Sequence, residues 1–208
     1  MKFVEEYRKS LQADRRRLHE RYRYQDSVIK VVGVGSVGTR CYLSLALADD
    51  DDPLFLQVKE ARRSVLESPR GKSRYAHQGF RVVEGQRVMQ AASDIFLGWA
   101  RTMGHDYYLR QFRDMKVSAE IETFQSGTLV GYAKLCGWAL ARAHAKAGDA
   151  AMIAGYLGSN DQFDNALAQY SEAYADQAER DFKTFQAAIS SGRLSTEPAK
   201  GAGLEFLL

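Results

Sequence analysis

A glycine-rich loop and a later lysine are the residues whose types and spacing could bind phosphate. The loop runs from Gly33 to Gly38, with Gly35 and Ser36 between them, and Lys59 closes the strand-like run 54–59. Glycine lets the backbone approach phosphate oxygens that a Cβ would exclude, and a lysine ammonium neutralises their charge. This pattern is typical of two folds, dinucleotide-binding domains and protein-kinase-like lobes.

The residues after the loop favour the kinase-like alternative. A dinucleotide site needs a helix directly after the glycines. Residues 39–47 (TRCYLSLAL) instead begin with β-branched and aromatic types and lead into the turn signal DDDDP at 49–53. The order strand, glycine turn, strand, tight turn and strand with a terminal lysine indicates a kinase-like lobe. A dinucleotide fold and a hairpin that binds nothing remain as alternatives.

A kinase-like site also needs a glutamate on the neighbouring helix to hold the lysine. Glu84 lies in the middle of a helix predicted over 78–92 and is the expected partner, with Glu60 and Glu67 as rivals. The plainer alternatives are an exposed strand-end lysine for Lys59 and a surface glutamate for Glu84.

Charged residues follow the strand predicted over 107–112. We expect the backbone of this strand to face a nucleobase, because it occupies the hinge position of a kinase-like lobe. Arg110, Gln111, Asp114 and Lys116 are then candidate ligand contacts. An ion-pair network is the alternative interpretation of this cluster.

Composition and charge exclude several classes of function. The chain is 45% hydrophobic and 26% charged, which is typical of a globular protein, and its net charge of +3 gives no support for a nucleic-acid partner. The one basic cluster, Arg15 to Arg17, fits the exposed face of a helix. No spacing of histidine, cysteine or acidic residues predicts a metal site.

Cysteine usage and hydropathy predict a cytoplasmic protein without a membrane partner. Cys41 and Cys136 lack paired spacing, so we expect reduced thiols. The sequence has no apolar run long enough to span a bilayer, and its first residues lack the apolar stretch of a secretory signal.

The chain is predicted to fold as an α+β protein with a small antiparallel sheet, one packed helix and a helical bundle. We expect an N-terminal helix within 1–26, a glycine-loop sheet lobe over 27–116, a helical lobe over 117–194 and a flexible tail over 195–208. The expected elements are helices over 2–22, 78–92, 129–147, 149–157 and 161–190, a first hairpin within 27–59, and a second hairpin from 95–99 and 107–112.

One part of a kinase-like enzyme is missing from the predicted elements. The helix over 129–147 leads to Gly148 and Asp149, as a helix before a catalytic loop would. The following residues, 150–154, include neither the asparagine nor a second acidic residue that would bind metal. Phosphoryl transfer by this chain alone is therefore not expected.

Several long runs resemble the bacterial domain of unknown function 2252 family. These runs are VVGVGSVGTRCY (31–42), DDPLFLQVKEA (51–61), RVVEGQRVMQAASDIFLGW (81–99), DYYLRQFRDMK (106–116), CGWALARAHAKAGD (136–149) and YADQAERD (174–181). The chain resembles the C-terminal half of that family. An upstream half with a GDxHxxNFG run and a DFD-like run would supply the catalytic and metal elements. The resemblance therefore implies a kinase-like phosphotransferase with a rearranged order of elements.

The sequence leads to one expected function and one alternative. We expect the nucleotide-binding half of a phosphotransferase, with ATP and Mg²⁺ as ligand and a separate upstream half-protein as partner. The alternative is a non-enzymatic interaction module, or a truncated remnant of a longer protein. A half-domain would expose apolar surface, so self-association is also expected.

Overall fold

The computed structural model of the chain describes residues 2–30, 38–49, 51–112 and 118–195. Within these residues the fold is mixed α+β, with one five-stranded antiparallel sheet and seven α-helices. The chain forms two compact units, Met1–Ala147 and Gly148–Leu208. The first unit contains the sheet and all the candidate site residues named from the sequence.

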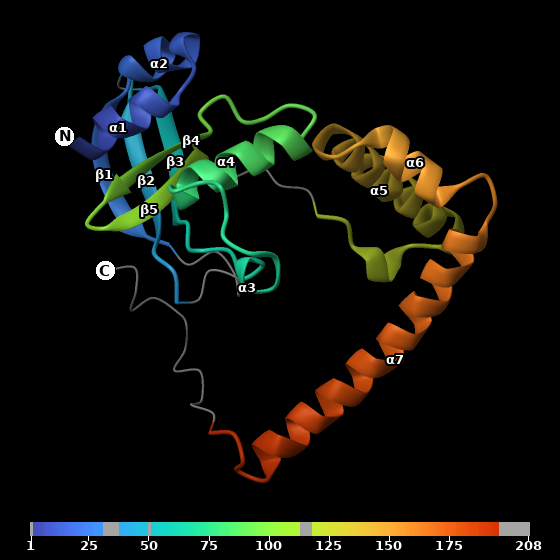
Figure 1. Cartoon of the computed structure of the whole chain (residues 1–208). Coiled ribbons are helices and arrows are strands. Elements are labelled where there is room, and N and C mark those ends of the chain that lie inside the picture. Colours follow the sequence, from blue (N-terminus) through green and yellow to red (C-terminus); the bar gives the residue numbers. More distant parts are fainter. Residues whose placement is uncertain (1, 31–37, 50, 113–117, 196–208) are drawn as a thin grey trace. The chain divides into compact units, whose positions relative to one another are not determined.

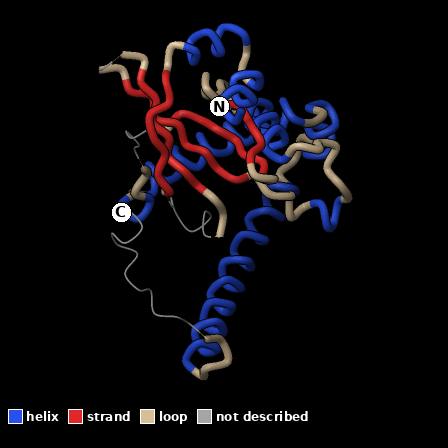
Figure 2. The backbone as a smooth tube through the Cα atoms, turned by 90° about the vertical axis from the view of Figure 1, so that its left-hand side faces the viewer, coloured by secondary structure: helices blue, strands red, loops and turns tan. Residues whose placement is uncertain are grey.

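The sheet has the strand order β1-β2-β3-β5-β4, and all its neighbouring strands are antiparallel (Figures 1 and 2). The chain passes from β1 to β2 through the glycine loop and from β2 to β3 through the aspartate turn. The expected first hairpin is therefore confirmed. A strand, β2, follows the loop, whereas a dinucleotide site would need a helix at that position. The strands are β1 Arg23–Ile29, β2 Cys41–Leu47, β3 Pro53–Glu60, β4 Gly98–Thr102 and β5 His105–Gln111.

Helices α1 (Lys2–Ser10) and α4 (Gln78–Met89) cover opposite faces of the sheet. Consecutive residues of a strand point to opposite faces. In β4, Gly98 therefore faces α1 and Trp99 faces α4. A Cβ on Gly98 would lie 2.8 Å from the Tyr7 ring of α1. The Trp99 ring lies 4.5 Å, between centroids, from the Phe80 ring of α4.

The hydrophobic core fills the α1 face of the sheet. Alternate residues of β3 and β5 supply it, as expected for strands with one face against a helix. Within it the Tyr7 hydroxyl donates a 2.6 Å hydrogen bond to the carbonyl oxygen of Phe96. The buried members are Tyr7, Leu11, Leu54, Leu56, Val58, Phe96, Ala100, Tyr107 and Leu109.

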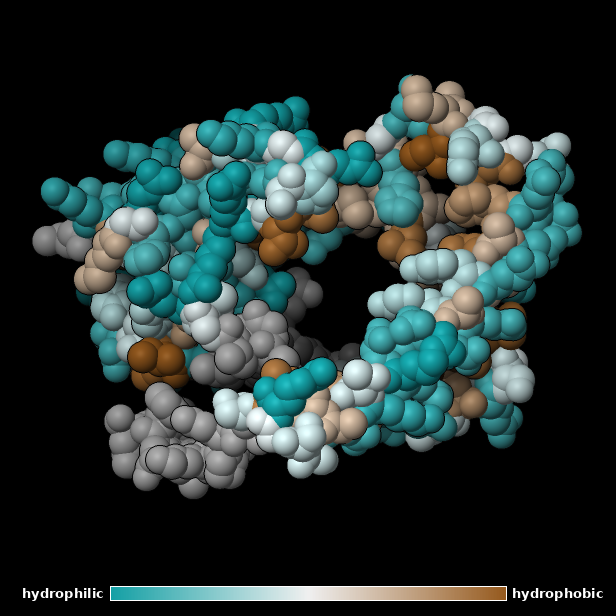
Figure 3. Space-filling model, turned by 60° about the horizontal axis from the view of Figure 1, so that its bottom comes forward, coloured by the Kyte–Doolittle hydropathy of each residue, from teal (hydrophilic) through white to brown (hydrophobic). Residues whose placement is uncertain are grey.

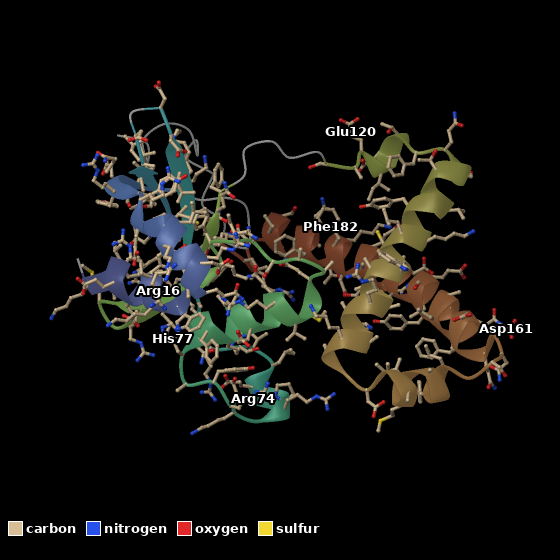
Figure 4. The ribbon with its side chains drawn as sticks, turned by 90° about the horizontal axis from the view of Figure 1, so that it is seen from above. Arg16, Arg74, His77, Glu120, Asp161 and Phe182 are labelled. Carbon is tan, nitrogen blue, oxygen red and sulfur yellow. The ribbon has the colours of Figure 1, made fainter. Side chains whose placement is uncertain are left out.

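The N-terminal segment forms two helices, so the single helix expected over 2–22 is wrong. Helix α1 ends at Ser10 and α2 spans Ala13–Glu20. The Ser10 hydroxyl donates to the carbonyl of Tyr7 at 2.7 Å and accepts from the amide of Trp99 at 2.8 Å, which fixes the helix end against β4. Arg16, labelled in Figure 4, donates to the carbonyl of Arg8 at 2.9 Å and caps the last turn of α1.

The start of α4 is fixed to β5 by direct backbone packing. A Cβ on Gly79 would lie 2.1 Å from the carbonyl oxygen of Tyr107. Asp106 accepts a 2.6 Å hydrogen bond from the amide of Gln78. The side chain of His77, labelled in Figure 4, caps the helix by accepting from the amide of Phe80 at 3.2 Å. These contacts hold α4 over the sheet face opposite the hydrophobic core.

The second hairpin is confirmed, with its strands displaced from the expected ranges. Strand β4 starts three residues later and β5 two residues earlier than expected, and the turn between them lies at Met103 and Gly104. Both turn residues have positive φ, 49° and 77°. Such a pair is typical of a two-residue hairpin turn whose twist matches the strands.

Helices α5 (Ser126–Ala147), α6 (Ala150–Leu157) and α7 (Gln162–Ser190) match the last three expected helices in type and order. Asp149 caps α6 by accepting from the amide of Met152 at 2.9 Å. None of the helices in the described ranges is long and apolar enough to cross a membrane. From residue 196 onwards, the expected tail lies outside the described residues. The remaining elements are α3 Glu67–Arg70 and the 3₁₀ turn Ile121–Thr123.

Candidate phosphate-binding site

One row of residues crosses the sheet on the face that α4 covers. Direct cross-strand partners point to the same face, and the register aligns Cys41 with Lys59, Lys59 with Tyr108, and Tyr108 with Trp99. Lys30 extends this row beyond β1, because its amide donates to the carbonyl of Cys41 at 2.9 Å. Since Trp99 faces α4, Lys59 faces the same side.

Lys59 is half-buried, and no residue that the structure describes pairs with its charge. Its ammonium group makes no hydrogen bond or ion pair with any residue in the described ranges. A lysine held partly away from water gains from an anion placed against its ammonium group. Lys59 is therefore a half-buried cation on the α4 side of the sheet whose charge no described carboxylate balances.

Two further cations lie on this face, around the buried thiol of Cys41. Burial raises the pKa of Cys41, while the positive charges of Lys59, Arg110 and Lys30 act against this increase. No carboxylate within the described segments forms an ion pair with any of the three cations. We name Lys30, Lys59 and Arg110 the cation cluster.

Neutral groups orient two members of the cation cluster. Arg110 donates from Nε and Nη2 to Oε1 of Gln57, at 3.1 and 3.0 Å. The ammonium group of Lys30 lies 5.1 Å from the centre of the Phe112 ring, which is a cation–π distance. Both partners are uncharged, so the described residues leave the positive charge of the cluster without a counter-charge on this face of the sheet.

A cavity of about 240 Å³ adjoins Arg110 on the same face. Amide side chains, one carboxylate, the Arg110 guanidinium and one aromatic ring line it, so its walls offer hydrogen bonds together with a surface for stacking. Asp94 is held in place there, because it accepts from the amides of Phe96 at 2.7 Å and Gln111 at 2.8 Å. The lining residues are Gln57, Gln86, Gln90, Ala92, Asp94, Arg110, Gln111 and Phe112.

The glycine loop is described only at its C-terminal end. Gly38 has a φ of 73° and lies shortly before β2; a side chain would be strained in this conformation. Of the other expected contacts, Gly33, Gly35, Ser36, Asp114 and Lys116 lie outside the described residues. Gly38 leads into β2, which is the neighbour of the strand that carries Lys59.

The structure does not bring Glu84 to Lys59, so the expected ion pair is corrected. Glu84 binds Arg87 within α4 at 3.1 Å. The reason is the helical phase: Val83, with none of its surface exposed, faces the sheet, and the next residue is turned by about 100° around the helix. The sequence pattern indicated where Glu84 lies along the helix but not the direction in which its side chain points.

The two rival glutamates also have other partners. Glu67 binds Arg63 at 2.5 Å. Glu60 binds Arg40 at 3.2 Å and Arg62 at 3.1 Å, and only 6% of its side chain is exposed. Sequence reasoning named Glu60 only as a rival partner for Lys59 and missed these contacts. The alternation of side chains along a strand offered a signal, because adjacent residues such as Lys59 and Glu60 must point to opposite faces.

Comparison with known proteins identifies a family for the chain. No curated protein and no solved structure matches it. A family model described as an uncharacterized protein conserved in bacteria (DUF2252) matches residues 1–188 of the 208 residues. The sheet, the cation cluster and most of α7 lie within the matched range, so the chain belongs to the bacterial DUF2252 family.

Proposed function

We propose that the chain is the nucleotide-binding part of a kinase-like phosphotransferase, with ATP and Mg²⁺ as its ligand. The observation that carries this proposal is the cation cluster, in which Lys59 lies on the α4 face without a carboxylate partner among the described residues. A nucleoside triphosphate would supply these three cations with the negative charge that no described carboxylate gives them.

The order of elements supports the same assignment. Protein kinases carry their phosphate-binding lysine on the third strand, after a glycine-rich loop, and follow it with a helix that packs on the sheet. Here the glycine loop joins β1 to β2, Lys59 lies on β3, and α4 lies between β3 and β4 in the chain. The cavity beside Arg110 is then the place for the base or the ribose.

The metal ion in this proposal arrives with the nucleotide. No group of three metal-binding side chains is found in the part of the chain that the structure describes. Magnesium is commonly held through phosphate oxygens and waters with one or two carboxylates. The resemblance to kinase-like enzymes therefore implies that the carboxylates, and the catalytic base, come from a separate half-protein.

A calorimetric titration with the magnesium complex of a non-hydrolysable ATP analogue tests the proposal. We expect saturable binding by the wild type and at least about tenfold weaker binding by Lys59→Ala, because a charge-assisted contact contributes about 1.5–3 kcal/mol. Lys72→Ala is the matched control, since Lys72 is exposed on a loop before α4. A folded wild type that does not bind would refute the proposal.

One observation favours the alternative function, a non-enzymatic interaction module. Large apolar side chains on α5, α6 and α7 are exposed, among them Trp138 at 59%, Tyr156 at 79% and Tyr170 at 62%. Apolar residues are visible on the surface in the space-filling view (Figure 3). Exposed apolar patches often mark interaction sites. This alternative requires that the chain self-associates or forms a stable complex with another protein, and that it does not bind nucleotide. Sedimentation equilibrium measures the mass of the associated species and so tests it.

A further inference from the structure

We propose that Glu60 is a positioning residue of the phosphate site, which ties the end of the glycine loop to the strand that carries Lys59. This inference rests on the proposed function. It assigns to Glu60 the organising role that the sequence pattern led us to expect of Glu84.

Glu60 collects hydrogen bonds from the segment that leaves the glycine loop. Its Oε2 accepts from the backbone amide of Arg40 at 3.0 Å and from Nη1 of the same residue at 3.2 Å. The backbones are also joined, because the amide of Glu60 donates to the carbonyl of Arg40 at 2.8 Å. The first residues after the loop are therefore fixed at the end of β3.

A second connection reaches the loop itself. Arg62 donates from Nε to Oε1 of Glu60 at 3.1 Å and from Nη2 to the carbonyl oxygen of Gly38. Gly38 is the last glycine of the loop, and Glu60 follows Lys59 directly in the chain. The path Gly38, Arg62, Glu60 therefore sets where the loop ends relative to Lys59.

The charge of Glu60 is a permanent part of this connection. Burial alone would raise the pKa of its carboxyl group, but the hydrogen bonds from the Arg40 amide and from the Arg62 and Arg40 guanidinium groups outweigh it, and the pKa falls to about 2. Glu60 is thus ionised at neutral pH. A neutral amide of the same shape would keep the packing and lose the charge-assisted bonds.

Affinity and hydrogen exchange together test the role of Glu60. We expect Glu60→Gln to bind the magnesium complex of the ATP analogue about tenfold more weakly. The reason is that a displacement of the loop end relative to Lys59 weakens the phosphate contacts even when the fold persists. Exchange of the Arg40 amide hydrogen should accelerate in this variant. Glu60→Asp should recover part of the affinity and part of the protection of this amide from exchange. Glu67→Gln is the matched control, because Glu67 binds only Arg63 among the described residues and lies on α3.

Arg62→Ala separates positioning from folding. This variant removes the bond to Gly38 and leaves the bonds between Glu60 and Arg40, so it decides the question if Glu60→Gln does not fold. We expect it to weaken binding as well. Faster Arg40 exchange with unchanged affinity in Glu60→Gln, or unchanged affinity in Arg62→Ala, would overturn the inference. A wild type that binds no nucleotide would instead refute the proposed function.

Discussion

Lys59 and Cys41 are direct cross-strand partners on β3 and β2, and both lie on the face of the sheet that α4 covers. The thiol is buried, with 2% of Cys41 exposed, whereas Lys59 is half-buried beside it, and its ammonium group has no hydrogen bond or ion pair among the described residues. A cation placed next to a small apolar group, with Lys30 and Arg110 nearby, gains most from a ligand that brings several negative charges. This relationship is the physical basis of the proposed phosphate site.

Replacing Glu84 should leave nucleotide binding nearly unchanged. Glu84 is paired with Arg87 on the same helix at 3.1 Å and does not contact Lys59. We expect Glu84→Gln to keep the affinity for the ATP analogue within about twofold of wild type and to lower stability by no more than about 0.5 kcal/mol, as for a helix ion pair. Calorimetry and urea denaturation measure the two quantities. A loss of affinity as large as that of Lys59→Ala would show that Glu84 reaches the lysine after all.

Acid should destabilise the sheet unit through His19. Burial, followed by the charge of Arg8, lowers the pKa of His19 from 6.5 to about 4, and its Nδ1 accepts from Nε of Arg8 at 3.2 Å. Because the folded pKa is below the unfolded one, the unfolded state binds the proton first. The contribution of the neutral His19 side chain to the free energy of unfolding is complete above pH 6.5 and is lost as the pH falls towards 4. We expect a loss of about 2 kcal/mol at about pH 5.

The variant His19→Gln isolates this contribution. It removes the titrating group and should flatten the decline of unfolding free energy between pH 6.5 and about 4, although it lowers stability at neutral pH. Urea denaturation at a series of pH values measures the effect. An equally steep decline in the variant would assign the acid sensitivity to other groups.

Two glycines should respond to alanine in opposite directions. A Cβ on Gly98 would lie 2.5 Å from the Ser10 hydroxyl and 2.8 Å from the Tyr7 ring, so Gly98→Ala should cost about 1–3 kcal/mol by overpacking. Gly85 is exposed inside α4, and a Cβ there would have no neighbour within 4 Å. Gly85→Ala should therefore stabilise by about 0.5–1 kcal/mol. Urea denaturation measures both changes, and stabilisation by Gly98→Ala would contradict the packing of α1 on β4.

The sheet was predictable because its signals are local. The glycine loop, the aspartate turn before Pro53 and the strand-like residues between them define the first hairpin without information from the rest of the chain. The type and order of the later helices follow likewise from apolar periodicity. The exact strand ends were not predictable, since the turn at Met103 and Gly104 has no dipeptide signal as strong as Asn-Gly.

The contacts of the candidate site were predictable only in part. The pattern placed Lys59 on the third strand, but the direction of Glu84 depends on the phase at which α4 packs on the sheet, and Val83 sets that phase. The break after Ser10 depends on a hydrogen bond to Trp99, which is far away in the sequence. The role of Glu60 likewise needs Arg40 and the sheet register.

The most direct measurement is calorimetric titration of the magnesium complex of the ATP analogue into the wild type and into Lys30→Ala, Lys59→Ala and Lys72→Ala. If the cation cluster holds the phosphates, the wild type binds with saturation, Lys30→Ala and Lys59→Ala each lose about tenfold or more in affinity, and Lys72→Ala stays within about twofold of the wild type. Equal binding by Lys59→Ala and wild type, or no binding by a folded wild type, would contradict the account.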